Sequence, residues 1–153
     1  MNEKPIIILF KENELNISKL YALYALNIPQ KKDFWKKLSE EEVAHAASIS
    51  GNYKNTNGKD GIVENKFSRG VIRYVMNFVI EQLEKSKSEK ISHQDALFTA
   101  LRIERSMLEK KCFDIFTPVS ETLKNVLRKL NDETEQHVEI LIDELKKNKW
   151  TSE

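Results

Sequence analysis

Residues that break helices are rare in this chain and unevenly placed. The 153 residues include four glycines and three prolines, and every glycine falls between Gly51 and Gly70. A fold made of β-strands needs many tight turns, and those turns need glycine and proline. Apolar residues make up 40% of the chain, which is enough to bury a core and excludes a disordered protein. We therefore predict an all-α protein that folds as one domain over residues 1–153.

Helical periodicity fills the long stretches between these breakers. Apolar residues recur every three or four positions over about 5–28, 30 into the 50s, 68–87, 92–116 and 118–149. Pro29 ends the first helix, because the residue before a proline is pushed out of the helical region. Ser92 is a good N-cap, with Asp95 three residues further on. The stretch 52–65, rich in Asn, Gly, Lys and Asp, predicts an exposed loop.

The lengths of the links predict how these helices connect. Tight links join the first helix to the second and the fourth to the fifth, so each pair is expected to form an antiparallel hairpin. The long connection between the two hairpins carries a helix of its own over 68–87, whose apolar stripe is core or interface. One long crossover between two hairpins is the connectivity of a ferritin-like four-helix bundle.

Charge and cysteine content exclude several classes of protein. Lys and Arg number 25 against 24 Asp and Glu, so the net charge of +1 gives no reason to expect nucleic acid as a partner. The single cysteine, Cys112, excludes an internal disulfide and a CxxC metal knuckle. The apolar run Ile6–Phe10 is too short for a signal peptide, and no stretch reaches the roughly 20 residues of a membrane helix. We expect a cytoplasmic protein without a membrane partner.

Polar and ionisable residues interrupt the apolar stripe of each long helix in the two hairpins. An isolated ionised carboxylate in a dry interior is too unfavourable to keep without a partner. For Glu104, the neighbouring Arg102 and Arg105 lie on the wrong faces of their helix to supply one. A divalent cation neutralises such groups and uses carboxylate and imidazole as ligands. The interrupting residues are Glu14, Glu42, His45, Glu104, Thr134 and His137.

The spacing of these residues sharpens the prediction of a metal site. Glu42 and His45 form Glu-x-x-His, which places both side chains on one face of a helix. Di-metal bundles take one Glu from each of two helices and Glu-x-x-His from each of the other two. The last helix supplies His137 but has Thr134 at the Glu position. Glu133, on the same face, is either solvated or a substitute ligand through a local change in the helix.

A weak internal repeat relates the two hairpins. The segment Leu38–His45 aligns with Leu130–His137, with leucine at the start and histidine at the end of both. The separation of Glu14 from His45 is nearly that of Glu104 from His137. A duplicated helical hairpin would give this pattern. Because three glutamates follow one another at 40–42, at least two of them are expected to point away from any site.

The same residues resemble the rubrerythrin branch of the ferritin-like superfamily over about 8–50 and 95–145. The resemblance rests on Glu12 and Glu14, Leu20-Tyr21, Tyr24-Ala25, Pro29, Phe34-Trp35, Leu38, Glu41-Glu42, His45-Ala46, Ala100-Leu101, Ile103-Glu104, Glu109 and His137. It implies a non-haem di-iron centre that reduces peroxide or O₂. The implied iron ligands are Glu14, Glu42, His45, Glu104 and His137, and Tyr21 would support a ligand carboxylate. The same ligands suit Mn or Zn as well.

Two departures from that family pattern leave alternatives open. Thr134 stands where a ligand usually bridges both metals, so a degraded bundle with one metal or none, acting as a binding or scaffold protein, is the alternative function. The chain has no rubredoxin-like CxxC pairs and would need an external electron donor such as a rubredoxin-type protein. A homodimer is expected by resemblance, with Phe67, Tyr74 and Phe78 as possible contacts. Tyr24 is expected in the core and His93 in solvent.

Overall fold

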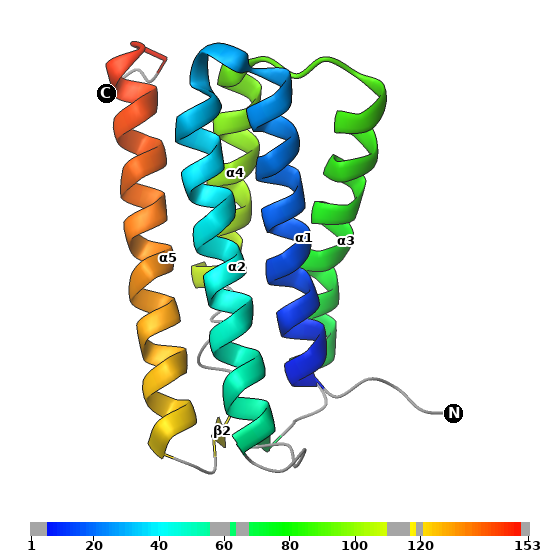
Figure 1. The fold of residues 1–153 in the computed structure, drawn as a ribbon, viewed down its shortest axis with the longest axis vertical. Helices are drawn as coiled ribbons and strands as arrows, with labels where there is room; N and C mark the ends of the chain where they lie inside the picture. Colours follow the sequence, from blue (N-terminus) through cyan, green and yellow to red (C-terminus); the bar gives the residue numbers. More distant parts are fainter. Residues whose placement is uncertain (1–5, 56–61, 64–67, 110–116, 119–120, 151–153) are drawn as a thin grey trace.

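Five α-helices run side by side in the computed structural model of the chain, which describes residues 6–55, 62–63, 68–109, 117–118 and 121–150 (Figure 1). The helices are α1 (Ile6–Asn27), α2 (Lys32–Asn55), α3 (Ser68–Ser88), α4 (His93–Glu109) and α5 (Glu121–Lys147). A short 3₁₀ turn, η1 (Pro29–Lys31), joins α1 to α2. The prediction of an all-α protein is confirmed. The second helix extends to Asn55, a little beyond the predicted start of the loop.

The helices alternate in direction along the long axis of the molecule (Figure 1). Helix α3 carries the chain from the end where α2 stops to the end where α4 begins, and it packs on α1 and α4. Helix α2 lies beside α5. Two-residue strands, β1 (Ile62–Val63) and β2 (Thr117–Pro118), pair antiparallel at one end of the bundle. The short ladder ties together the two connections that contain these strands.

Local sequence signals set the helix ends. Helix α1 ends at Asn27, just before Pro29. The N–H of Ile28 still donates to Tyr24 O at 2.9 Å and is the last hydrogen bond of the helical pattern. The side chain of Ser92 accepts a hydrogen bond from the Asp95 N–H at 3.1 Å, so the predicted N-cap is confirmed.

The polar residues predicted on the apolar stripes do lie inside the bundle. Glu14, Glu42, His45, Glu104, Thr134 and His137 are each at most 3% exposed. Apolar neighbours on the same stripes are also buried, among them Phe10, Ile17, Tyr21, Tyr24, Leu38, Ile49, Leu97, Leu101, Leu127, Leu130 and Leu141. Arg102 and Arg105 are exposed, as expected. The prediction that His93 is solvated is wrong, because the residue is 8% exposed and its ring lies among aromatic rings.

The crossover helix has a buried stripe and an exposed face. Ile72, Val75 and Val79 are buried in the core, whereas Tyr74 is 54% exposed. Phe67 and Cys112 lie outside the described residues. Among the helices that the structure describes, none combines the length and apolar character needed to cross a membrane.

Candidate metal centre

Carboxylates and imidazoles from four helices meet inside the bundle. Two groups of three residues each have their potential ligand atoms within 4.8 Å of one another. The first group brings together side chains from α1 and α2, and the second brings together side chains from α2, α4 and α5. They are Glu14, Glu42 and His45, and Glu42, Glu104 and His137. Glu42 belongs to both groups, so they form two halves of one site.

The carboxylate of Glu42 lies between the two histidines. Its Oε2 is 3.3 Å from His45 Nδ1, and its Oε1 is 3.2 Å from His137 Nδ1. Glu14 Oε2 lies 3.6 Å from the Nδ1 atom of His45, and Glu104 Oε1 lies 3.3 Å from that of His137. The two imidazole rings stack with centroids 5.5 Å apart. Each half therefore has one imidazole, one carboxylate of its own and one oxygen of the shared carboxylate.

A buried oxygen without a hydrogen bond makes these residues suited to hold a cation. Glu42 Oε2 is buried and makes no hydrogen bond within the described residues, although His45 Nδ1 is near it. A buried carboxylate oxygen without a partner is unfavourable, and native proteins seldom leave one. A divalent ion held between Glu42 and either histidine would satisfy it. Mixed carboxylate and imidazole ligands suit iron, manganese or zinc.

The protonation of the site is strongly perturbed. Burial raises the pKa of Glu14 well above its ordinary value, and the nearby charge of Glu42 raises it further. Burial lowers the pKa of both histidines, but their carboxylate neighbours outweigh it and raise the pKa to about 11 for His45 and for His137. Without a cation, the imidazoles therefore hold protons at neutral pH. Since a metal binds neutral imidazole, metal binding must release protons.

Two further carboxylates hold the outer nitrogens of the histidines. Glu133 Oε2 lies 2.6 Å from His45 Nε2, and Glu41 Oε1 lies 3.0 Å from His137 Nε2. Both contacts cross between α2 and α5. A ligating histidine commonly donates its other N–H to a carboxylate, which fixes the tautomer and the ring orientation. Glu41 and Glu133 are thus placed to direct Nδ1 of each ring inward.

The structure places Glu133 beside His45 but outside both three-residue groups. Of the successive glutamates, Glu40 is exposed, whereas Glu41 reaches His137 and Glu42 belongs to the ligand groups, so the expectation that at least two of the three point away from the site is wrong. The internal repeat contained the signal for this role, because it aligns Glu41 with Glu133. Each residue holds the histidine on the other helix.

Thr134 and Tyr21 complete the inner surroundings. The Thr134 hydroxyl donates to Leu130 O at 2.8 Å, so it faces its own helix and supplies no carboxylate. The Tyr21 hydroxyl donates to Glu104 Oε1 at 2.9 Å. Burial and the charge of Glu104 raise the pKa of Tyr21 well above its ordinary value, so the phenol keeps its proton and orients that carboxylate.

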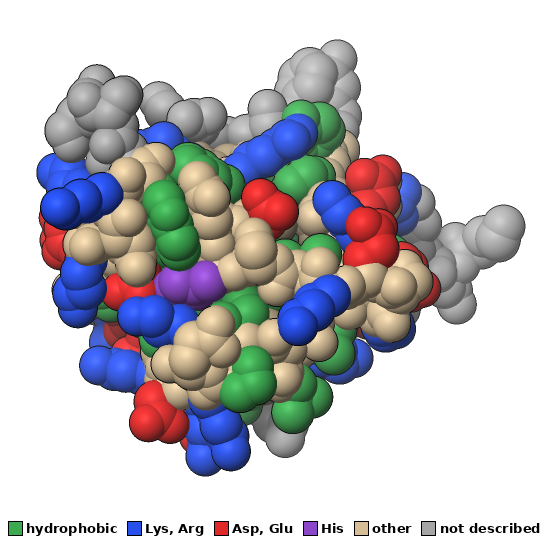
Figure 2. Space-filling view, turned by 90° about the horizontal axis from the view of Figure 1, so that it is seen from above, with side chains coloured by type: hydrophobic (Ala, Val, Ile, Leu, Met, Phe, Trp, Pro, Cys, Tyr) green, Lys and Arg blue, Asp and Glu red, His purple; other side chains and the backbone are tan. Residues whose placement is uncertain are grey.

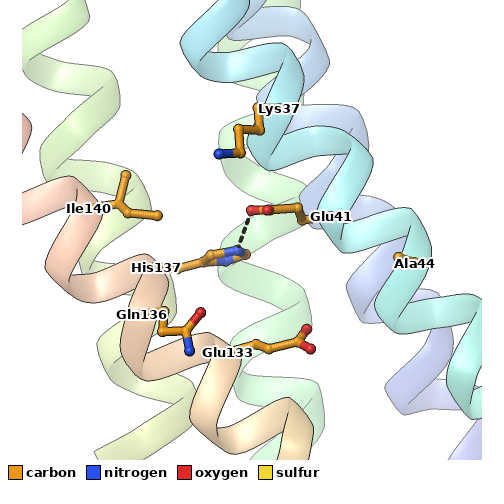
Figure 3. A pocket seen from close by; sticks show the side chains of 7 residues that line it. All are labelled: Lys37, Glu41, Ala44, Glu133, Gln136, His137 and Ile140. Carbon is orange, nitrogen blue, oxygen red and sulfur yellow. Dashed lines mark hydrogen bonds and ion pairs between the residues drawn. The ribbon is translucent and has the colours of Figure 1, made fainter.

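A pocket between α2 and α5 connects the site with the outside (Figure 3). Its volume is about 410 Å³. Figure 3 shows Glu41 reaching across it to His137, with Glu133 on the His137 side of the opening. The lining residues are Lys37, Glu41, Ala44, Glu133, Gln136, His137 and Ile140. A small molecule can approach the histidines by this route.

Comparison with known proteins finds no matching family model, no similar curated protein and no similar solved structure.

Proposed function

We propose that this chain is a ferritin-like bundle of the rubrerythrin type that binds two iron ions and reduces peroxide or O₂. The observation that carries the proposal is the sharing of Glu42 by two ligand groups. One oxygen of this carboxylate faces each histidine, which is the arrangement needed to bridge two ions. The other carboxylates of the two groups, those of Glu14 and Glu104, come from different helices, so each ion would have one carboxylate of its own.

The residues around the ions have separate tasks. A pair of iron ions, when bound, supplies the two electrons that a peroxide bond needs for its reduction. Tyr21 holds Glu104 in place, and the outer carboxylates Glu41 and Glu133 hold the two imidazoles. The buried surroundings keep bulk water away from the inner carboxylates and strengthen their attraction for a cation. The pocket between α2 and α5 admits a small oxidant.

The electrons must come from another molecule under this proposal, because the lone Cys112 cannot form a rubredoxin-like centre. We propose a rubredoxin-type protein as the donor, and a cytoplasmic homodimer as the working form.

Thr134 favours the second candidate, a bundle with one metal ion or none that serves as a binding protein. The Thr134 hydroxyl donates a hydrogen bond to Leu130 O and brings no negative charge to a second ion. Among the residues that the structure describes, two acidic side chains besides Glu42, those of Glu14 and Glu104, belong to the ligand groups, so the negative charge available for two ions is limited. Metal stoichiometry distinguishes the two functions.

The test is reconstitution of the metal-free protein with Fe(II) under anaerobic conditions, followed by metal analysis and a peroxide consumption assay. We expect two irons per chain and iron-dependent loss of peroxide with an added reductant. Glu40→Gln is the matched control, because Glu40 is exposed on α2, the helix that also carries Glu42. It should change neither the iron content nor the loss of peroxide. One zinc ion or no metal, unchanged by iron reconstitution, would refute the di-iron proposal.

A further inference from the structure

A run of aromatic rings connects the metal centre with one end of the bundle. The ring of Tyr21 lies 5.5 Å from that of Trp35, measured between centroids, and Trp35 lies 5.8 Å from His93. The ring of His93 in turn lies 5.7 Å from that of Trp150. Tyr24 lies against the side of the run, 4.9 Å from Trp35. Both tryptophans of the chain belong to this run.

Each oxidisable ring in the buried part of the run has a proton acceptor beside it. The Tyr21 hydroxyl donates to Glu104 at 2.9 Å, and the Trp35 indole N–H donates to His93 Nδ1 at 3.1 Å. Because an indole N–H can only donate, His93 Nδ1 is the acceptor and its own hydrogen lies on Nε2. That hydrogen goes to Glu144 Oε2 at 2.8 Å, and Lys31 lies 2.9 Å from the same oxygen.

A strained helix end holds Trp150 at the outer end of the run. Lys149 has φ of 60°, and it is the only residue other than glycine with a positive φ among the described residues. The N–H of Lys149 donates to Lys146 O and that of Trp150 to Leu145 O, each at 3.0 Å, which is a Schellman motif. A left-handed lysine costs about 1–2 kcal/mol. This turn brings the partly exposed indole of Trp150 against His93.

The outer end of the run lies on a surface rich in basic side chains. Figure 2 looks down the long axis onto this end of the bundle and shows Lys and Arg side chains, with some Asp and Glu among them, around apolar and backbone surface. Lys146, Lys147 and Lys149 are exposed next to Trp150. Such a surface attracts an anionic molecule.

We infer that the rings of Tyr21, Trp35 and Trp150 carry single electrons between the surface and the metal centre, with His93 between the two tryptophans as the proton acceptor of Trp35. This inference rests on the proposed function. Tyrosine and tryptophan are the side chains that lose one electron most readily, and each releases a proton when it does so. The electron passes inward while each proton moves only along the hydrogen bond already present.

The electrons and protons balance at every ring. Once peroxide has oxidised the centre, Tyr21 gives the centre one electron and passes its hydroxyl proton to Glu104, and Trp35 replaces that electron while its indole proton passes to His93. Trp150 then gives an electron to Trp35 and exchanges its indole proton with solvent, to which it is partly exposed. A one-electron reductant in solution, anionic at its docking surface, returns the electron to Trp150. Each buried ring recovers its proton when it is reduced again. Two such passages, with two protons from solvent, convert one hydrogen peroxide into two waters.

The experiment runs the path in the reverse direction in metal-free protein, so that its outcome does not depend on bound iron. Photogenerated tris(bipyridine)ruthenium(III), with peroxodisulfate as the final electron acceptor, serves as the solution oxidant. Tyr53→Phe and Tyr74→Phe are introduced into every protein tested, which leaves Tyr21 and Tyr24 as the tyrosines. These two are at most 1% exposed and cannot meet the oxidant directly. Transient absorption and electron paramagnetic resonance then follow the radicals.

We expect a tryptophan radical first and a tyrosyl radical that grows as the first decays. Trp35→Phe and Trp150→Phe should each lower the rate of tyrosyl formation roughly tenfold or more, because a phenylalanine ring raises the barrier by more than about 1.4 kcal/mol. Tyr21→Phe should remove most of the signal. Phe34→Leu is the packing control, since Phe34 lies edge-on to Trp35 at 5.1 Å but is not oxidisable, and it should leave the yield unchanged.

Undiminished tyrosyl formation in both tryptophan variants would overturn the inference. That result in a protein that binds two irons refutes the path and leaves the proposed function standing. If tyrosyl formation slows in both tryptophan variants but the protein binds no iron, the result supports the path through the rings and refutes the proposed function.

Discussion

Glu42→Gln is the substitution that most directly tests the shared carboxylate. Glutamine keeps the size of the side chain but removes the charge and the oxygen that faces His45 or His137. Because Glu42 belongs to both ligand groups, we expect the variant to lose metal at both halves of the site. Glu14→Gln should weaken only the half containing His45.

The magnitude follows from the position of Glu42. Removing a group that merely orients a metal ligand typically lowers affinity by about 10–100-fold. Loss of an inner carboxylate should therefore exceed about 100-fold, or roughly 2.7 kcal/mol, at each half of the site. The metal-free fold is also affected, because removing one partner of a buried charge pair costs about 3–5 kcal/mol.

Calorimetric titration with Co(II) measures both the affinity and the number of ions bound, and the cobalt absorbance reports the coordination. Circular dichroism first establishes that each variant is folded. Glu14→Gln and Glu104→Gln serve as the half-site comparisons, with Glu40→Gln as the exposed control. The reasoning is refuted if folded Glu42→Gln binds two ions with unchanged affinity, or if Glu14→Gln abolishes both ions.

Four further outcomes are expected. Glu41→Gln and Glu133→Gln should each lower metal affinity by about 10–100-fold in the same titration without changing the number of ions, since each carboxylate only orients a histidine. The pKa of about 11 at both site histidines means that metal displaces their protons, so affinity measured by titration should rise from pH 7 toward pH 10 and buffer-dependent heats should reveal proton release. Burial would raise the pKa of Glu144, but its hydrogen bond with His93 and the charge of Lys31 outweigh burial and lower that pKa. The stability that ionised Glu144 contributes to the fold is therefore complete above the ordinary carboxyl pKa and is lost as the pH falls through the pKa of Glu144 in the folded protein. Glu144→Gln should flatten the fall in stability at acidic pH, measured by denaturant unfolding. Lys149→Gly should raise stability in the same unfolding assay by about 0.5–1 kcal/mol, because glycine adopts the left-handed conformation without strain; an unchanged midpoint would contradict that reasoning.

Much of the helical architecture was predictable from local signals. Pro29 and Ser92 act on the backbone within a few residues of themselves, so the helix ends that they specify are where the sequence places them. The apolar stripes also predict which side chains turn inward, including Glu14 and Glu104, because a face of a helix is fixed by its 3.6-residue repeat.

Other features of the site were not predictable because they depend on how distant helices are rotated and staggered. The sequence gives no distance between α2 and α5, so it could not say that Glu41 reaches His137 or that Glu133 lies outside the inner ligand groups. The burial of His93 similarly required Trp35 and Glu144 to come from other helices and satisfy both ring nitrogens.

The sequence by itself therefore determined that this chain is helical and that acids and histidines lie on its buried faces, since both follow from the spacing of neighbouring residues. Only the tertiary structure decided that Glu42 stands between the two histidines with one oxygen toward each. The physical reason is that periodicity fixes the face on which a side chain lies, whereas the packing of helices fixes the atoms that it meets.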